Sequence, residues 1–296
     1  MKQKDGVYMK TIHTDVPFPS LSSLQLVATD LDGTLLRSDK TISEQTSTLL
    51  QRLQSVGVAI VLVSARPPRV LRQIARDFHF SGLAICCNGA IIYDLDRDSP
   101  LQEHALLPQQ IEHLVTFLSA SLFDLSFAAE NGQSVICEAA FHPFCTQNDS
   151  PPPRIVDISA ICQTPQIKIL VHHATLPIEE LHERVSLLLD SGVYSVTYSA
   201  SDFLEIMLGG VQKGEVLAAL CAQLDIAAHS VVAFGDMPND LPMLQWAGLG
   251  VAVANAHPLV LQAADVITLS NEEDGVAHLL ERLIEYTPKN STIAHS

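Results

Sequence analysis

The chain has 296 residues, 47% of them apolar and 17% charged, which is enough for two globular domains with substantial cores. Thirty-three acidic residues against 17 Lys and Arg give a formal net charge of −16. This charge disfavours binding to nucleic acid or to an anionic membrane surface, because both need a basic footprint, and an anionic substrate would need a local positive site.

The first 22 residues are polar, carry two prolines and show no periodicity, so we predict a flexible leader over 1–22. They contain no apolar segment typical of a signal peptide, and no apolar run in the chain approaches the length of a membrane span. The six cysteines show no C-x-x-C pair and no zinc-like spacing. These features predict a cytoplasmic protein with reduced cysteines.

Strands and helices alternate from Leu24 onward. An apolar strand (Leu24–Thr29) precedes a helix that begins near Ser43, a good N-cap, and ends at Gly57. A second apolar strand (Val58–Ser64) leads to a helix opened by two prolines, and the short strand "LAICC" then leads to Asn88. This order predicts a parallel sheet with helices packed on it.

The same rhythm returns near the C-terminus. A helix at "GEVLAALCAQL" is followed by the strand Val231–Gly235, a helix around Leu241–Trp246, and strands near "LGVAV" and "DVITL". The strands are almost continuously apolar, as expected for a sheet that is covered on both faces. The fold class predicted for these two parts is α/β, a doubly wound Rossmann-like parallel sheet.

The middle of the chain reads differently. It mixes short alternating segments such as "QSVICEA" and "QIKILVHH" with helical stretches, which predicts an α+β domain inserted into the α/β one. The predicted division of the chain is a leader at 1–22, a discontinuous core at 23–90 and 209–288, an inserted cap domain at 91–208 and a tail at 289–296.

Two acids close the first strand of the core. Asp30 and Asp32 lie one residue apart in "LVATDLDGTLL", and residues i and i+2 of a strand share a face about 6–7 Å apart. Like charges on one face raise one another's pKa unless a cation or hydrogen-bond donors compensate. The pair therefore needs a partner.

Polar clusters follow several of the predicted core strands, at the rim where open parallel sheets bind ligands. Four of them are far apart in sequence and can converge only through the sheet: Asp30-Leu31-Asp32-Gly33-Thr34, Ser64-Ala65-Arg66, Lys213, and Gly235-Asp236-Met237-Pro238-Asn239-Asp240.

Together these clusters suit attack on a phosphoryl group. Mg²⁺ is bound by few protein oxygens, which Asp30 and Asp236 would supply from side chains and Asp32 from its backbone carbonyl. An aspartate can attack phosphorus to form an aspartyl-phosphate, and Asp32 could act as acid and base. Ser64, Lys213 and the amides near Leu31 would hold the phosphoryl oxygens.

The four motifs, in this order, resemble the haloacid dehalogenase superfamily, whose pattern is D-x-D-G-T, a Ser or Thr at a strand end, Lys, and G-D-x-x-N-D. The segments "NGAIIYD", "GVQKGEVLAAL", "FGDMPNDLPMLQWAGLGVAVANAHPLV" and "NEEDGVAHLL" resemble its Cof-type branch, which carries a large (C2-type) cap. The resemblance spans Leu24 to about Glu285 and is strong over the core. Over the cap only length and position fit.

The resemblance implies a role for each matching residue. Asp30 matches the nucleophile, Asp32 the acid/base and Asp236 a metal ligand, while Asp240 matches a ligand or a carboxylate that supports one. The residues implied for phosphate binding are Leu31, Gly33, Ser64, Ala65, Lys213 and Asn239. Ala65 stands where the family commonly has Gly, which removes no functional side chain.

Two further residues have open interpretations. Arg66 is expected to pair with a nearby acid rather than to react. Asn88 forms either a plain turn into the cap or a contact with substrate.

We predict a Mg²⁺-dependent phosphatase that hydrolyses a small phosphorylated metabolite through an aspartyl-phosphate, without nucleic-acid or membrane partners. Two alternatives remain open: a phosphosugar mutase, whose cap shields the intermediate from water, and a non-catalytic sugar-phosphate sensor. The sequence leaves the substrate and the oligomeric state undetermined.

Overall fold

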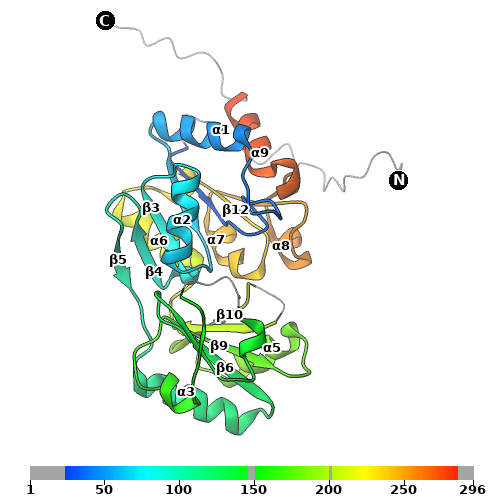
Figure 1. Cartoon of the computed structure of the whole chain (residues 1–296). Coiled ribbons are helices and arrows are strands. Elements are labelled where there is room, and N and C mark those ends of the chain that lie inside the picture. The colour runs from blue at the N-terminus through cyan, green and yellow to red at the C-terminus, as the bar shows by residue number, and fades with distance from the viewer. Residues whose placement is uncertain (1–23, 146–150, 200–201, 286–296) are drawn as a thin grey trace, which may run out of the picture.

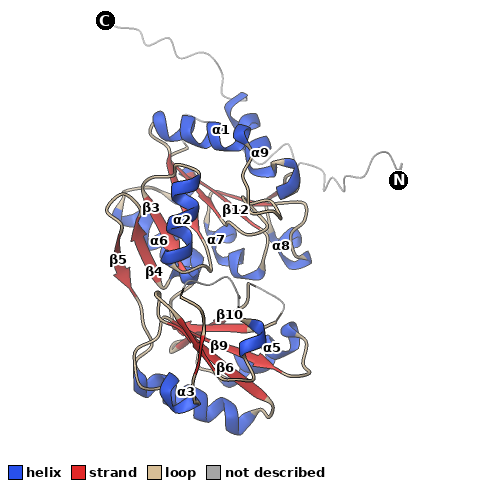
Figure 2. Cartoon of the chain, viewed as in Figure 1, coloured by secondary structure: helices blue, strands red, loops and turns tan. Residues whose placement is uncertain are grey.

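The computed structural model describes residues 24–145, 151–199 and 202–285, so the predicted leader (1–22) and tail (289–296) lie outside the described residues. Two lobes, each built on its own sheet, lie one above the other in Figure 1, and helices pack on both sheets (Figure 2).

The larger lobe is built on a mostly parallel sheet with strand order β14-β13-β12-β1-β2-β3-β4-β5. The central strand β1 pairs in parallel with β12 on one side and β2 on the other. This is the predicted Rossmann-like arrangement. The strands are β1 (Leu26–Thr29), β2 (Ala59–Val63), β3 (Leu83–Cys86), β4 (Ile91–Asp94), β5 (Ser99–Glu103), β12 (Val231–Gly235), β13 (Leu249–Ala252) and β14 (Val266–Ile267).

Helices cover both faces of this sheet. Along β1, Val27 packs into the hydrophobic cluster that contains α1, α2 and α9, whereas Leu26 and Ala28 pack into the cluster that contains α6, α7 and α8. Because successive strand residues point to opposite faces, an all-apolar strand serves both clusters. The helices are α1 (Glu44–Ser55), α2 (Pro68–Asp77), α6 (Lys213–Gln223), α7 (Leu241–Trp246), α8 (Pro258–Ala263) and α9 (Gly275–Glu285).

Local sequence fixes where the early helices begin. Ser43 caps α1, and its side chain accepts a hydrogen bond from the backbone N–H of Thr46, as predicted. Pro68 occupies the first turn of α2, where a missing N–H costs nothing. Both helices therefore start immediately after the loops that leave the sheet.

The smaller lobe is a six-stranded sheet with order β10-β11-β9-β6-β7-β8, and helices α3 and α5 pack on one of its faces. The other face meets the larger lobe, since residues of both line a common cavity. Its elements are α3 (Pro108–Ser121), β6 (Leu125–Glu130), β7 (Val135–Cys137), β8 (Arg154–Ile155), α4 (Ile158–Ile161), β9 (Lys168–His173), α5 (Ile178–Leu188), β10 (Tyr194–Thr197) and β11 (Leu204–Leu208).

The inserted domain begins later in the chain than predicted. Strands β4 and β5 extend the larger sheet, so the chain leaves that sheet after Glu103 instead of after Ala90. After the turn at Cys87–Gly89 the chain reverses and pairs antiparallel with β3. An apolar strand such as "IIYD" would suit either lobe, and only its pairing decides which one it joins.

Candidate active site

The predicted clusters meet at one edge of the larger sheet. Asp30 follows β1, Ser64 follows β2, Asn88 follows β3 and Asp236 follows β12, and these four strands are neighbours. Lys213 opens α6. The parallel strands place these carboxyl-terminal ends side by side, so distant segments form one site.

Lys213 lies at the centre of the site. Its Nζ donates to Asp30 Oδ1 and to Asp240 Oδ1, each over 2.6 Å, and the residue is only 1% exposed. Burial alone would lower the pKa of Lys213, but the charges of Asp240 and Asp30 outweigh it and raise the pKa above its ordinary value. The ammonium is therefore a fixed positive charge in an otherwise acidic protein.

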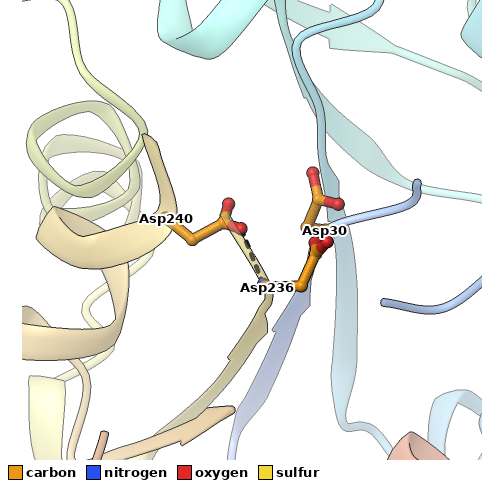
Figure 3. Close-up of side chains that lie close together, drawn as sticks. All are labelled: Asp30, Asp236 and Asp240. Carbon is orange, nitrogen blue, oxygen red and sulfur yellow. Dashed lines mark hydrogen bonds between the residues drawn. The ribbon is translucent and has the colours of Figure 1, made fainter. Parts of the chain in front are cut away.

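Three buried carboxylates surround this ammonium. Oxygen atoms of Asp30, Asp236 and Asp240 lie within 4.8 Å of one another (Figure 3). Both oxygens of Asp240 already have partners in the protein. Its Oδ2 accepts hydrogen bonds from the backbone N–H groups of Asp236 (2.9 Å) and Met237 (3.0 Å), and its Oδ1 accepts one from Lys213. Asp30 and Asp236 are the two carboxylates left to face a ligand.

These two carboxylates suit a divalent cation. Burial raises the pKa of Asp236 to about 7, and the neighbouring charge of Asp240 adds to the shift. Burial likewise raises the pKa of Asp30 well above its usual range, against the opposing charge of Lys213. Within the described chain no donor reaches their Oδ2 atoms. Such oxygens are the hard ligands that Mg²⁺ accepts, so the donor set fits the predicted cation.

Asp32 is not part of this cluster and is held by two cations. Arg66 donates hydrogen bonds to both carboxylate oxygens, with Nη2 2.6 Å from Oδ1. Lys40 Nζ lies 2.8 Å from the same Oδ1. Partial burial opposes the shift, but these hydrogen bonds and charges hold the pKa of Asp32 below its usual range. The expectation that Arg66 pairs with a nearby acid is confirmed. A metal contact through the Asp32 carbonyl stays a prediction.

Gly33 is required by the approach of Asp236. Its φ is +80°, and a Cβ built there would lie 2.4 Å from Asp236 Oδ2. Thr34, next in the chain, donates its hydroxyl to Asp236 Oδ1 over 2.8 Å. Leu31 is fully buried. The loop from Asp30 to Thr34 is thus shaped to fit the carboxylate of Asp236.

The remaining predicted residues form the other side of the site. Ser64 Oγ accepts the backbone N–H of Arg66 over 3.1 Å, and both Ser64 and Ala65 line the cavity described below. Asn239 donates its amide to Asn88 Oδ1 (2.9 Å). Asn88, which has a left-handed φ of 56°, donates in turn to Glu205 of the smaller lobe (3.0 Å). Asn88 is therefore more than a turn, because it links the two lobes.

A cavity of about 570 Å³ opens in front of this edge and extends to the smaller lobe. Sequence reasoning missed the residues that the smaller lobe contributes, notably Lys168 and Glu205, which form a buried ion pair. Lys168 also donates to the carbonyl of Ala65 (2.9 Å). The signal was present: each is an isolated charge in an apolar strand, in "IKILV" and "LEIML". Lys40 was not predicted as a partner of Asp32 either.

Known proteins match this chain over most of its length. The sequence model of the haloacid dehalogenase-like hydrolases matches residues 27–280. A putative phosphatase of Haemophilus influenzae is 29% identical, over 86% of this chain and 96% of that protein. A 5-amino-6-(5-phospho-D-ribitylamino)uracil phosphatase of Bacillus subtilis is also 29% identical, with the same coverage.

A solved structure shares the fold. The crystal structure of a haloacid dehalogenase-like hydrolase from Bacteroides thetaiotaomicron superposes with a TM-score of 0.71 and 30% identity, covering 88% of this chain and 99% of that one. No helix within residues 24–145, 151–199 and 202–285 combines the length and apolarity needed to cross a membrane.

Proposed function

We propose that this chain, which belongs to the haloacid dehalogenase-like hydrolases and is a phosphatase of that family, hydrolyses small phosphorylated metabolites with Mg²⁺ as its cofactor. The observation that carries the proposal is the contact of Asp30 with Lys213 beside Asp236, with Asp30 lining a cavity between the two lobes. One relative bears the name of a phosphatase for a ribitylaminouracil phosphate, an example of a small metabolite.

Asp30 is the proposed nucleophile. Lys213 holds its carboxylate through Oδ1, so one of the two oxygens can attack phosphorus in line with the leaving oxygen while the other is left for Mg²⁺. The bond that forms joins Asp30 to phosphorus, and the bond that breaks joins phosphorus to the leaving alcohol. Water then attacks the aspartyl-phosphate, which releases inorganic phosphate and restores the carboxylate.

Asp32 is the proposed acid and base. Held by Arg66 and Lys40, it favours the carboxylate form, which takes a proton from the water in the second step. Delivery of a proton to the leaving oxygen in the first step requires these two cations to turn toward the incoming phosphate. Both side chains line the cavity that the phosphate would enter.

The phosphoryl oxygens would be held by Lys213, by the Ser64 hydroxyl and by backbone N–H groups of the loop after β1, with Asn239 beside them. Mg²⁺, when bound by Asp30 and Asp236, supplies positive charge that offsets their repulsion and that of the phosphate. Asp240 supports the site by holding Lys213 and the loop after β12.

The test is release of inorganic phosphate from a panel of small phosphate esters, with Mg²⁺ or with a chelator, by the wild type and by Asp30→Asn. We expect release that depends on Mg²⁺ and falls at least about 10⁴-fold in Asp30→Asn, as for other lost nucleophiles. Asp77→Asn, an exposed aspartate on α2, is the matched control and should retain full activity. Equal activity of Asp30→Asn and wild type would refute the assignment of the nucleophile.

The same panel separates the alternative functions. Transfer of phosphate to a second position of a sugar, without inorganic phosphate, would indicate a phosphomutase. Tight binding of a phosphate ester by the wild type with neither product would indicate a sensor.

A further inference from the structure

The cavity between the lobes carries as many basic as acidic side chains, four of each. In its smaller-lobe part, Arg69 forms two 2.8 Å hydrogen bonds with Glu130, and Lys168 is paired with Glu205. Nearer the sheet edge, Arg66 and Lys40 are paired with Asp32, as described above. Among the described residues that line the cavity, every Lys and Arg thus contacts an acid.

This pairing limits the charge of what can bind. A second phosphate or a carboxylate on the leaving group would have to be buried near Glu130 and Glu205 without a cation to spare, and a buried unpaired charge is costly. The leaving group that fits the smaller-lobe part of the cavity is therefore uncharged.

The same part of the cavity has an apolar, aromatic wall. Three of the ten Phe residues in the chain line it, and their rings lie in contact: Phe141 to Phe203 is 5.5 Å between centroids, and Phe141 to Phe144 is 6.0 Å. Phe141 is fully buried and supports the other two, which are partly exposed. Leu170 lies beside them. Phe144 stacks one ring face on His172, with 3.7 Å between the centroids, so Phe203 is the principal ring of this wall for a ligand. Partly exposed aromatic rings pack well against a flat ring.

Polar groups lie beside this wall, on the same face of the smaller sheet, where Glu205 of β11 is paired in register with Leu170 of β9. Glu205 accepts hydrogen bonds from Lys168, Asn88 and Ser199. Lys168 uses two of its three N–H donors on Glu205 and the Ala65 carbonyl, which leaves one for an acceptor on a ligand. Ser199 can accept as well as donate.

From these observations we infer that the physiological leaving group is an uncharged, flat heteroaromatic alcohol. Its ring packs on Phe203 and Phe144, and its polar edge meets Lys168 and Ser199, while the phosphate lies at Asp30. The volume of about 570 Å³ is in the range of roughly 300–1,000 Å³ typical of small-molecule sites. This inference rests on the proposed phosphatase function and names its substrate class.

The experiment compares kcat/KM for two heteroaromatic phosphates, flavin mononucleotide and pyridoxal 5′-phosphate, with that for glucose 6-phosphate and fructose 1,6-bisphosphate. Acetyl phosphate, which has no ring, reports the basic reaction. We expect at least one heteroaromatic ester to exceed both sugar phosphates by about tenfold or more, a difference that one favourable ring contact can supply.

Variants then test the wall itself. In Phe203→Leu, the ratio of kcat/KM for the preferred heteroaromatic ester to that for acetyl phosphate should fall about three- to tenfold, because Leu keeps apolar area but not the ring face. Phe144→Leu should act in the same direction and replaces the first variant if that one does not fold. Phe123→Leu, at an 82% exposed position outside the cavity, should leave the ratio unchanged.

The outcomes are distinguishable. Hydrolysis of acetyl phosphate that requires Asp30, combined with a preference for a sugar phosphate or with an unchanged ratio in both Phe variants, would overturn the inference and leave the phosphatase function standing. Absence of hydrolysis of every ester, acetyl phosphate included, would overturn the proposed function and the inference with it.

Discussion

At the scale of single residues, the site depends on close approaches that only certain side chains permit. Gly33 combines a left-handed φ of +80° with a position where a Cβ would lie 2.4 Å from an oxygen of Asp236. The first property costs an L-residue about 1–2 kcal/mol, and the second displaces a proposed metal ligand. The D-G pair of the first motif is thus more than a turn signal.

We predict that Gly33→Ala lowers kcat/KM about 100-fold and raises the Mg²⁺ concentration needed for half-maximal activity, because Asp236 must move. The measurement is phosphate release titrated with Mg²⁺. Gly57→Ala is the matched control, since Gly57 has a φ of +93° with no atom within 4 Å of a built Cβ. It should lose about 1–2 kcal/mol of stability and no activity. Similar Mg²⁺ requirements in the two variants would contradict the role of Gly33.

At the scale of secondary-structure elements, α2 connects the two lobes. Arg69 on this helix makes two hydrogen bonds with Glu130 at the end of β6, and their side chains are only 10% and 3% exposed. One turn further on, Arg72 pairs with Asp98 at the surface, with exposures of 37% and 41%. One helix therefore carries a buried and an exposed ion pair of the same chemistry.

We predict that Arg69→Met destabilises the protein by about 3 kcal/mol, because Glu130 is left as a buried charge without its partner. Arg72→Met should cost less than about 1 kcal/mol, as expected for a solvated pair. Urea unfolding of both variants, monitored by circular dichroism, measures the difference. Equal losses in the two variants would show that the contact between lobes contributes no more than a surface pair.

At the scale of the whole molecule, the formal charge of −16 and the buried acidic cluster act in the same direction. Both disfavour adding an anionic substrate unless a cation is present. The raised pKa of Asp236, about 7, reflects the same unfavourable addition of negative charge within the site. It predicts that Mg²⁺ and protons compete for this carboxylate.

The sign of the effect follows from linkage. Without metal, the folded-state pKa of Asp236, about 7, exceeds the unfolded value of about 3.9, so the folded protein binds more protons between these two pH values. The contribution of this group to stability is fully present below about pH 4 and is lost as the pH rises to about 7. Mg²⁺ binds the deprotonated carboxylates and reverses that loss.

We therefore predict that Mg²⁺ raises the melting temperature more at pH 8 than at pH 5.5, because at the lower pH protons occupy the ligands. Thermal melts with and without Mg²⁺ at both pH values provide the measurement. In Asp236→Asn the difference between the two pH values should shrink. An equal gain at both pH values in the wild type would exclude Asp236 as the group that titrates.

Sequence alone predicted most of the core and of its polar rim. Each strand of the larger sheet near the site is an uninterrupted apolar run that ends at a polar motif, and such runs have few alternatives to a buried parallel strand. The helix starts at Ser43 and at the two prolines were readable because capping depends on neighbours in sequence.

The tertiary structure decided what lies across the cavity. Three features depend on contacts between distant segments. Lys168, Glu205 and three Phe rings line one cavity with Asp30, Lys40 and Arg66 hold Asp32, and "IIYD" joins the larger sheet. Periodicity reports which residues of a strand share a face, but it does not report which strand or lobe that face meets. The local motifs therefore predict the reaction, whereas the cavity lining from which we infer the leaving group depends on how the two lobes pack.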